Sequence, residues 1–155
     1  MIKNLKIYDM DGTIVDSLHR YKTMPCGSRI DLQYWRENEH RAYDDSLLPL
    51  AAEYQADLKD PETYVIIATA RILREPDMRF IADKLGMPDY IISRRGDTDT
   101  RSGGLLKIKG LQKFFNLKNF RKAKAVFFED NKAYLKAVCD HFNIDGVFVP
   151  SQQGH

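Results

Sequence analysis

Two aspartates separated by one residue, Asp9 and Asp11, stand near the start of the chain and are followed directly by Gly12 and Thr13. Carboxylates at this spacing could share a divalent cation, and a carboxylate beside a metal can attack the phosphorus of an anionic ester. Asp9 would then be the nucleophile, while Asp11 could protonate the leaving oxygen and later take a proton from water. Gly12 permits a sharp turn that lets backbone amides approach a phosphate. The motif favours phosphoryl transfer, although D-x-D-G patterns also occur in calcium loops and ordinary turns.

Polar side chains also follow two other apolar runs. Thr69 ends one of them, and its hydroxyl could donate to a phosphoryl oxygen without adding charge. Arg71 comes two residues later, where its planar fork could grip a phosphate oxygen or form a surface ion pair. Glu129 and Asp130 follow the other run, and an acidic pair in this position is costly to bury unless it is paired or bound to metal. Asp130 could instead cap the helix that follows.

Two lysines precede this acidic pair. On a helix, Lys107 shares a face with Leu111 and Phe114, which must meet the core, whereas Lys109 shares its face with polar residues such as Lys113. A lysine on an apolar face needs an anionic partner, and a phosphate site at Asp9 would supply one. We therefore favour Lys107 over Lys109 as the lysine of the site.

The elements that would position these residues alternate along the chain. Short apolar runs without polar alternation are expected for strands that are covered on both faces, and amphipathic segments separate them. This order predicts an α/β, three-layer, Rossmann-like fold with a parallel sheet of five strands and helices on both faces. Ligands bind beyond the carboxyl ends of such strands, which is where the polar residues fall. The predicted strands are Leu5–Tyr8, Tyr64–Ala68, Tyr90–Ile92, Ala125–Phe128 and Gly146–Val149, and the predicted helices are Asp31–Tyr43, Ser46–Leu58, Pro76–Leu85, Leu105–Phe115 and Lys132–Phe142.

Asp-x-Asp-Gly-Thr followed by two apolar residues, then Thr69, a later lysine and the pair Glu129-Asp130, resembles the motifs of the haloacid dehalogenase superfamily, whose members are mostly phosphatases. The resemblance spans nearly the whole chain. It implies hydrolysis through an aspartyl-phosphate intermediate and a bound Mg²⁺, a cation that suits oxygen ligands. The magnesium ligands that it implies are Asp9, Asp130, Asp11 through its backbone carbonyl, and Glu129 directly or through water. Together with the arguments from the residues above, the predicted site comprises the catalytic Asp9, Asp11, Thr69 and Lys107 and the substrate-binding Gly12, Thr13 and Arg71.

The length of the segment between Thr13 and the second strand indicates how large a substrate the site can accept. Residues 1–155 are predicted to form one domain, with about 16–44 as a small cap of one helix plus loops. A small cap leaves the crevice nearly open, which suits a bulky substrate or one that a short flap can cover. Thr69-Ala70-Arg71 also resembles the phosphatase domains of nucleic-acid end-healing enzymes, so we expect a phosphate on a nucleotide or a nucleic-acid end.

Two alternatives differ from this expectation. One is a phosphatase of small phosphorylated metabolites. The other is a non-catalytic nucleic-acid-binding module that keeps the fold, but a dead site has no reason to hold the clustered negative charge of Asp9, Asp11 and Asp130.

Composition narrows the class further. Of 155 residues, 43% are hydrophobic and 30% charged, as in globular proteins, and no apolar run is long enough to span a membrane. Two cysteines and the absence of room for a signal peptide favour the cytoplasm. Residues 94–124 contain ten Lys/Arg and two Asp/Glu, a segment that could attract a polyanion or form a solvated helix face. Within it, Arg94, Arg95 and Arg101 could track a phosphate backbone.

Overall fold

The computed structural model describes residues 1–27 and 29–151. Its strands are β1 (Asn4–Tyr8), β2 (Val15–Asp16), β3 (Ser46–Leu47), β4 (Thr63–Ile72), β5 (Tyr90–Arg94), β6 (Lys124–Glu129) and β7 (Asp145–Phe148). Its helices are α1 (Leu32–Glu37), α2 (Ala51–Leu58), α3 (Glu75–Phe80), α4 (Gly103–Asn116) and α5 (Lys132–Phe142), with 3₁₀ turns η1 (Leu18–Arg20), η2 (Glu39–Asp44) and η4 (Lys118–Phe120) and a π-helical turn η3 (Ile81–Leu85).

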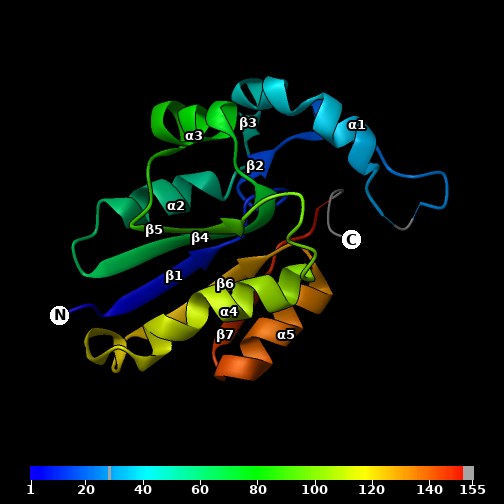
Figure 1. Ribbon diagram of the computed structural model, residues 1–155. Coiled ribbons are helices and arrows are strands. Elements are labelled where there is room, and N and C mark those ends of the chain that lie inside the picture. Colours follow the sequence, from blue (N-terminus) through cyan, green and yellow to red (C-terminus); the bar gives the residue numbers. More distant parts are fainter. Residues whose placement is uncertain (28, 152–155) are drawn as a thin grey trace.

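Five strands form one parallel sheet in the order β5-β4-β1-β6-β7. Figure 1 shows α2 and α3 over one face of this sheet and α4 and α5 over the other. The predicted five-stranded α/β architecture is confirmed. Because β1 has β4 on one side and β6 on the other, the chain changes direction in the sheet beside the end of β1, where α/β folds bind ligands.

The sheet separates two apolar layers. Along β4, Val65 and Ile67 pack beneath α2 and α3, while Ile66 and Ala68 pack beneath α4 and α5. All four are fully buried, which explains why this strand reads as a continuous apolar run. Burial of a side chain of the size of Ile67 stabilises the fold by about 1.5–3 kcal/mol.

Three predicted helices differ from the structure. The predicted helix Pro76–Leu85 is α3, which ends at Phe80, followed by the π-helical turn η3. The predicted helix Asp31–Tyr43 is divided into α1 and the 3₁₀ turn η2, and the predicted helix Ser46–Leu58 begins only at Ala51. The residue before a proline is disfavoured in helical conformation, so Pro49 prevents an earlier start. The preceding Ser46–Leu47 instead pairs with Val15–Asp16 as a short antiparallel sheet.

This two-stranded sheet is the base of the segment between β2 and β3. The segment contains η1, α1 and η2 and rises over the carboxyl end of the main sheet (Figure 1). This segment corresponds to the residues predicted to form a cap, about 16–44, and its role as a cap remains a prediction. None of the helices in the described part of the chain is both long and apolar enough to cross a bilayer.

Candidate active site

Asp9 follows β1 and begins a tight turn. Its backbone N–H donates to the carbonyl of Phe128 on β6 at 2.9 Å, which fixes it between the two strands. Gly12 follows with φ of 79°, a left-handed conformation that glycine adopts without strain. Beyond the turn, the Thr13 hydroxyl donates to Oδ2 of Asp9 at 2.9 Å. The carboxylate of Asp9 is therefore held at the carboxyl edge of the sheet.

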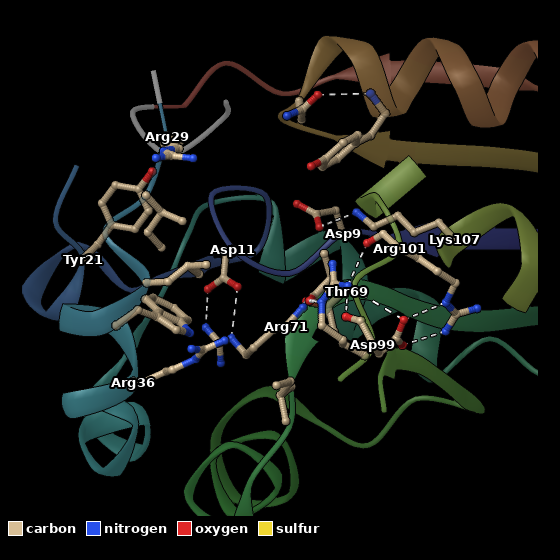
Figure 2. Close-up of a pocket in the computed structure, with 18 of the residues that line it drawn as sticks. Asp9, Asp11, Tyr21, Arg29, Arg36, Thr69, Arg71, Asp99, Arg101 and Lys107 are labelled. Carbon is tan, nitrogen blue, oxygen red and sulfur yellow. Dashed lines mark hydrogen bonds and ion pairs between the residues drawn. The ribbon is translucent and has the colours of Figure 1, made fainter. Parts of the chain in front are cut away.

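Lys107 lies on the inner face of α4 and reaches this carboxylate. Its ammonium donates to Oδ1 of Asp9 at 2.8 Å and to Oε1 of Glu129 at 2.5 Å, and the side chain is 1% exposed. Lys109 is exposed on the same helix. The structure thus places Lys107, not Lys109, beside Asp9 (Figure 2).

Asp9, Glu129 and Asp130 form a buried acidic cluster. Each offers a carboxylate oxygen within 4.8 Å of the others. Oδ2 of Asp130 is buried and, among the described residues, has no hydrogen-bond partner. Asp130 does not cap α5, because Asn131 does so through its own side chain. A buried carboxylate oxygen without a donor, next to two further carboxylates, fits a cation with oxygen ligands such as Mg²⁺.

The pKa values of these three acids also indicate a site that favours a bound cation. Burial, followed by the charge of Asp9, raises the pKa of Asp130 to about 7 and raises that of Glu129 well above its usual value. Burial would also raise the pKa of Asp9, but the Lys107 ammonium and hydrogen bonds outweigh it, and the pKa of Asp9 lies below its usual value. Ionisation of all three acids is unfavourable when one ammonium is the only nearby positive charge, so an additional cation would reduce the repulsion among the carboxylates.

Asp11 is not part of this acidic cluster. Its carboxylate receives the fork of Arg71, with Nε donating to Oδ2 at 3.0 Å and Nη2 to Oδ1, and the Ser17 hydroxyl donates to Oδ1 at 2.9 Å. Figure 2 shows the guanidinium facing both oxygens. The opposite nitrogen of Arg71, Nη1, donates to Asp77 at 2.5 Å. Arg71 therefore forms a buried rather than a surface ion pair, and its contact with a substrate phosphate remains a prediction.

Thr69 lies within β4 rather than after it, because the strand continues to Ile72. The pairing of β4 with β5 shifts register between Ala68 and Ile72, so the backbone is irregular at this threonine. Its hydroxyl oxygen accepts from the backbone N–H of Arg71 at 3.1 Å and stays available as a donor. Thr69 lines the same pocket as Asp9 (Figure 2).

The pocket over these residues has a volume of about 560 Å³. One wall comes from the segment between β2 and β3 and includes Tyr21, Leu32 and Trp35, and the opposite wall comes from the loop after β5. Leu32 is 53% exposed, so this wall presents apolar surface to the cavity. The pocket combines apolar and aromatic side chains on one wall with charged and polar side chains at its floor and on the other wall, and its size is typical of small-molecule sites.

The basic segment 94–124 does not form one surface. Arg94 donates to the backbone carbonyls of Ala70, Asp99 and Arg101, and Arg101 pairs with Asp99, so both line the pocket while holding its wall in place. Exposed basic residues gather instead after α4, at the opposite end of the sheet (Figure 1). These are Lys118, Arg121, Lys122 and Lys124.

Three buried charged residues beside the site, Arg20, Asp45 and Asp77, were not predicted from the sequence. Arg20 and Asp45 form a buried ion pair, and Asp77 joins it through Arg71. Only Asp77 has a local signal, since it is the third residue of α3 and accepts from the N–H of Arg74, as acids in a first helical turn commonly do. Arg20 and Asp45 are distant in sequence, and no local pattern pairs them.

Comparison with known proteins adds a family. The family described as Bacteriophage T5 5′-deoxynucleotidase matches residues 1–100. A 5′-deoxynucleotidase of Escherichia phage T5 is 34% identical over 107 residues, which cover 64% of this chain and 40% of the phage protein. The chain therefore spans less than half the length of this relative.

Solved structures add the fold. A chain of the Pnkp1/Rnl/Hen1 RNA repair complex is similar with a TM-score of 0.69 at 22% identity, over 97% of this chain and 43% of that one. A HAD-superfamily hydrolase of subfamily IA from Geobacter sulfurreducens is similar with a TM-score of 0.60 at 14% identity, over 94% of this chain and 86% of that one. The protein has the haloacid dehalogenase fold, and it belongs to the bacteriophage T5 5′-deoxynucleotidase family.

Proposed function

We propose that the protein is a phosphomonoesterase that transfers the phosphoryl group of a nucleotide or nucleic-acid end to Asp9 and then to water. Attack by a carboxylate oxygen of Asp9 on phosphorus forms an acyl phosphate and breaks the ester bond. Asp11, in its protonated form, gives its proton to the departing alcohol oxygen and becomes a carboxylate. It then takes a proton from the water that hydrolyses the acyl phosphate, which restores Asp9 and releases inorganic phosphate.

The residues around Asp9 support this sequence of steps. Lys107 touches the attacking carboxylate and can neutralise charge that develops on the transferring phosphoryl group. Thr13 orients the carboxylate through Oδ2. Asp9, Asp130 and the backbone carbonyl of Asp11 are the proposed ligands of Mg²⁺, with Glu129 as a direct or water-mediated contact. When bound, Mg²⁺ would neutralise the anionic substrate and polarise a phosphoryl oxygen.

The single observation that carries the proposal is the position of Asp9. It stands at the floor of a pocket of about 560 Å³, its carboxylate held by Lys107 and Thr13, beside a buried Asp130 oxygen for which the described residues supply no hydrogen-bond donor. A carboxylate held ionised and aimed into a cavity is suited to nucleophilic attack.

The pocket walls and the family support a nucleotide as the carrier of the phosphate. Tyr21, Leu32 and Trp35 offer apolar and aromatic surface on which a base could stack, in the segment proposed as a small cap. The family takes its description from a 5′-deoxynucleotidase. Polar side chains of the opposite wall, such as Thr100, can hydrogen-bond a sugar or base.

A substrate panel tests the proposal. Purified protein with MgCl₂ would be given 2′-deoxynucleoside 5′-monophosphates, oligonucleotides phosphorylated at the 5′ or 3′ end, and sugar phosphates, with Asp9→Asn as the control for contaminating phosphatases. We expect kcat/KM for a nucleotide or an oligonucleotide end to exceed that for any sugar phosphate by about tenfold or more, as differential binding of a base allows. A sugar phosphate turned over fastest would favour the metabolite phosphatase, and no turnover of any ester would favour a binding module.

A further inference from the structure

A buried ion pair joins the two ends of the segment between β2 and β3. Arg20 follows β2, Asp45 precedes β3, and the fork of Arg20 donates to both oxygens of Asp45 at 2.8 and 2.9 Å. Both residues are almost fully buried, at 1% and 4% exposure. The ring centroid of Trp35 in α1 lies 4.1 Å from Cζ of Arg20 and 5.2 Å from Cζ of Arg71. The pair therefore fixes the base of the segment directly beside the catalytic pocket.

The same pair is connected to Asp11 through one residue. Asp45 accepts from Nη2 of Arg71 at 3.4 Å, and that nitrogen also donates to Asp11. Arg71 thus contacts Asp77 through Nη1, Asp45 through Nη2, and Asp11 through both Nε and Nη2. Because a planar guanidinium cannot rotate without breaking several of these bonds, its acceptors determine where it presents its fork to Asp11.

The charges of the network show what Asp45 contributes. Two arginines, Arg20 and Arg71, face two fully buried carboxylates, Asp45 and Asp77, so these four charges balance before Asp11 is counted. The ring of His19 also contacts Asp45, with Nε2 at 2.7 Å from Oδ1. Asp11 is the additional acid, and its side chain is 24% exposed toward the pocket. If Asp45 loses its charge, two buried arginines share Asp77 alone, and the attraction of Arg71 for Asp11 grows. Asp11 would then be held away from the leaving oxygen.

We propose that Asp45, together with Arg20, is a positioning residue that sets the orientation of Asp11 through Arg71. The inference rests on the proposed function, in which Asp11 protonates the departing alcohol. It predicts that a substitution of Asp45 lowers the reaction rate only for esters whose leaving group must be protonated by Asp11. Esters of good leaving groups depart as anions without a proton, whereas the alkoxide of a nucleotide does not.

The experiment compares two esters in wild-type protein and the near-isosteric variant Asp45→Asn. With a 2′-deoxynucleoside 5′-monophosphate, kcat should fall by about 10- to 100-fold, a fraction of what general acid catalysis contributes. With 4-nitrophenyl phosphate, kcat should change by less than about threefold, because its leaving group needs no acid. In an Asp11→Asn background, Asp45→Asn should have no further effect on the nucleotide, since the two residues act in series.

A matched control separates positioning from lost stability. Phe114→Leu weakens the core among Tyr64, Tyr90 and Phe120, away from the network, and should lower both rates equally if it lowers either. If Asp45→Asn does not fold, Arg20→Lys keeps the charge, loses the fork and gives the same two rates. Equal losses on both esters in an active enzyme would overturn the inference alone. Wild-type protein that hydrolyses neither ester would contradict the proposed function and the inference with it.

Discussion

Lys107 is a fully buried lysine that forms ion pairs with two buried carboxylates. Its ammonium donates hydrogen bonds to Asp9 and Glu129. Burial alone would lower the pKa of Lys107, but the charges of these two carboxylates outweigh burial and raise it above the usual value. We expect Lys107→Met, which keeps the volume of the side chain and removes the charge, to lower kcat/KM by about 10²–10³. Lys109→Met should stay within about twofold, because Lys109 is exposed. Steady-state kinetics of both variants tests the assignment, and an equal loss in both would contradict it.

Gly12 tests the geometry of the turn after β1. A Cβ at this position would lie 2.1 Å from Oδ2 of Asp130, whereas Gly27, with a nearly identical φ of 76°, has no described atom within 4 Å of its Cβ position. Both alanine variants bear the left-handed strain of about 1–2 kcal/mol. Only Gly12→Ala should also displace Asp130, with a fall in kcat/KM on the order of 10²-fold. Matching losses in Gly27→Ala would show that backbone strain, not the contact, is responsible.

At the scale of elements, α4 determines where Lys107 lies. The helix approaches β5 through Gly110, where an added Cβ would lie 2.5 Å from Cγ2 of Ile92. Gly110→Ala gains about 1 kcal/mol of helix propensity. We nevertheless expect a net loss of about 1–2 kcal/mol in the free energy of unfolding, because overpacking forces the helix from the sheet.

The double variant Gly110→Ala/Ile92→Ala separates the two effects. It removes the atoms that the new methyl group meets, so its stability should exceed the sum of the single changes. Urea denaturation of the four proteins measures this coupling. Strict additivity would mean that the contact between α4 and β5 is not limiting.

The elements also show what a sequence can predict. The strands of the main sheet were found because each contains a short, mostly apolar run, and α5 matched from Lys132 to Phe142 because its faces differ in polarity. The pair β2–β3 was missed because strands of two residues carry no periodicity. The ion pair Arg20–Asp45 was missed for a related reason, since its energy comes from tertiary contact alone. The residues after strands were placed correctly at one edge because parallel topology brings strand ends together.

At the scale of the whole molecule, the site has an excess of negative charge. If the three carboxylates Asp9, Glu129 and Asp130 are all ionised, the single ammonium of Lys107 leaves two negative charges without a counterion. A divalent cation matches this excess, and its binding to the folded state alone would stabilise it by about 2.7 kcal/mol at 100 times Kd.

Thermal unfolding tests this charge balance. We expect MgCl₂ to raise the Tm of wild-type protein relative to EDTA, with NaCl of equal ionic strength as the control. Asp130→Asn should lose this increase, and in EDTA it should be at least as stable as wild type because one repelling charge is gone. An undiminished magnesium effect in Asp130→Asn would place the cation elsewhere.

The most direct test of the chemistry is to find the phosphoryl group on the protein. Wild-type protein and Asp9→Asn would be mixed with a phosphate ester and MgCl₂, quenched in acid within one turnover, reduced with borohydride to fix the acyl phosphate site, and digested for mass spectrometry. We predict a reduced residue at position 9 in wild type and at no other carboxylate. Turnover without modification at position 9, or turnover retained by Asp9→Asn, would contradict nucleophilic attack by Asp9.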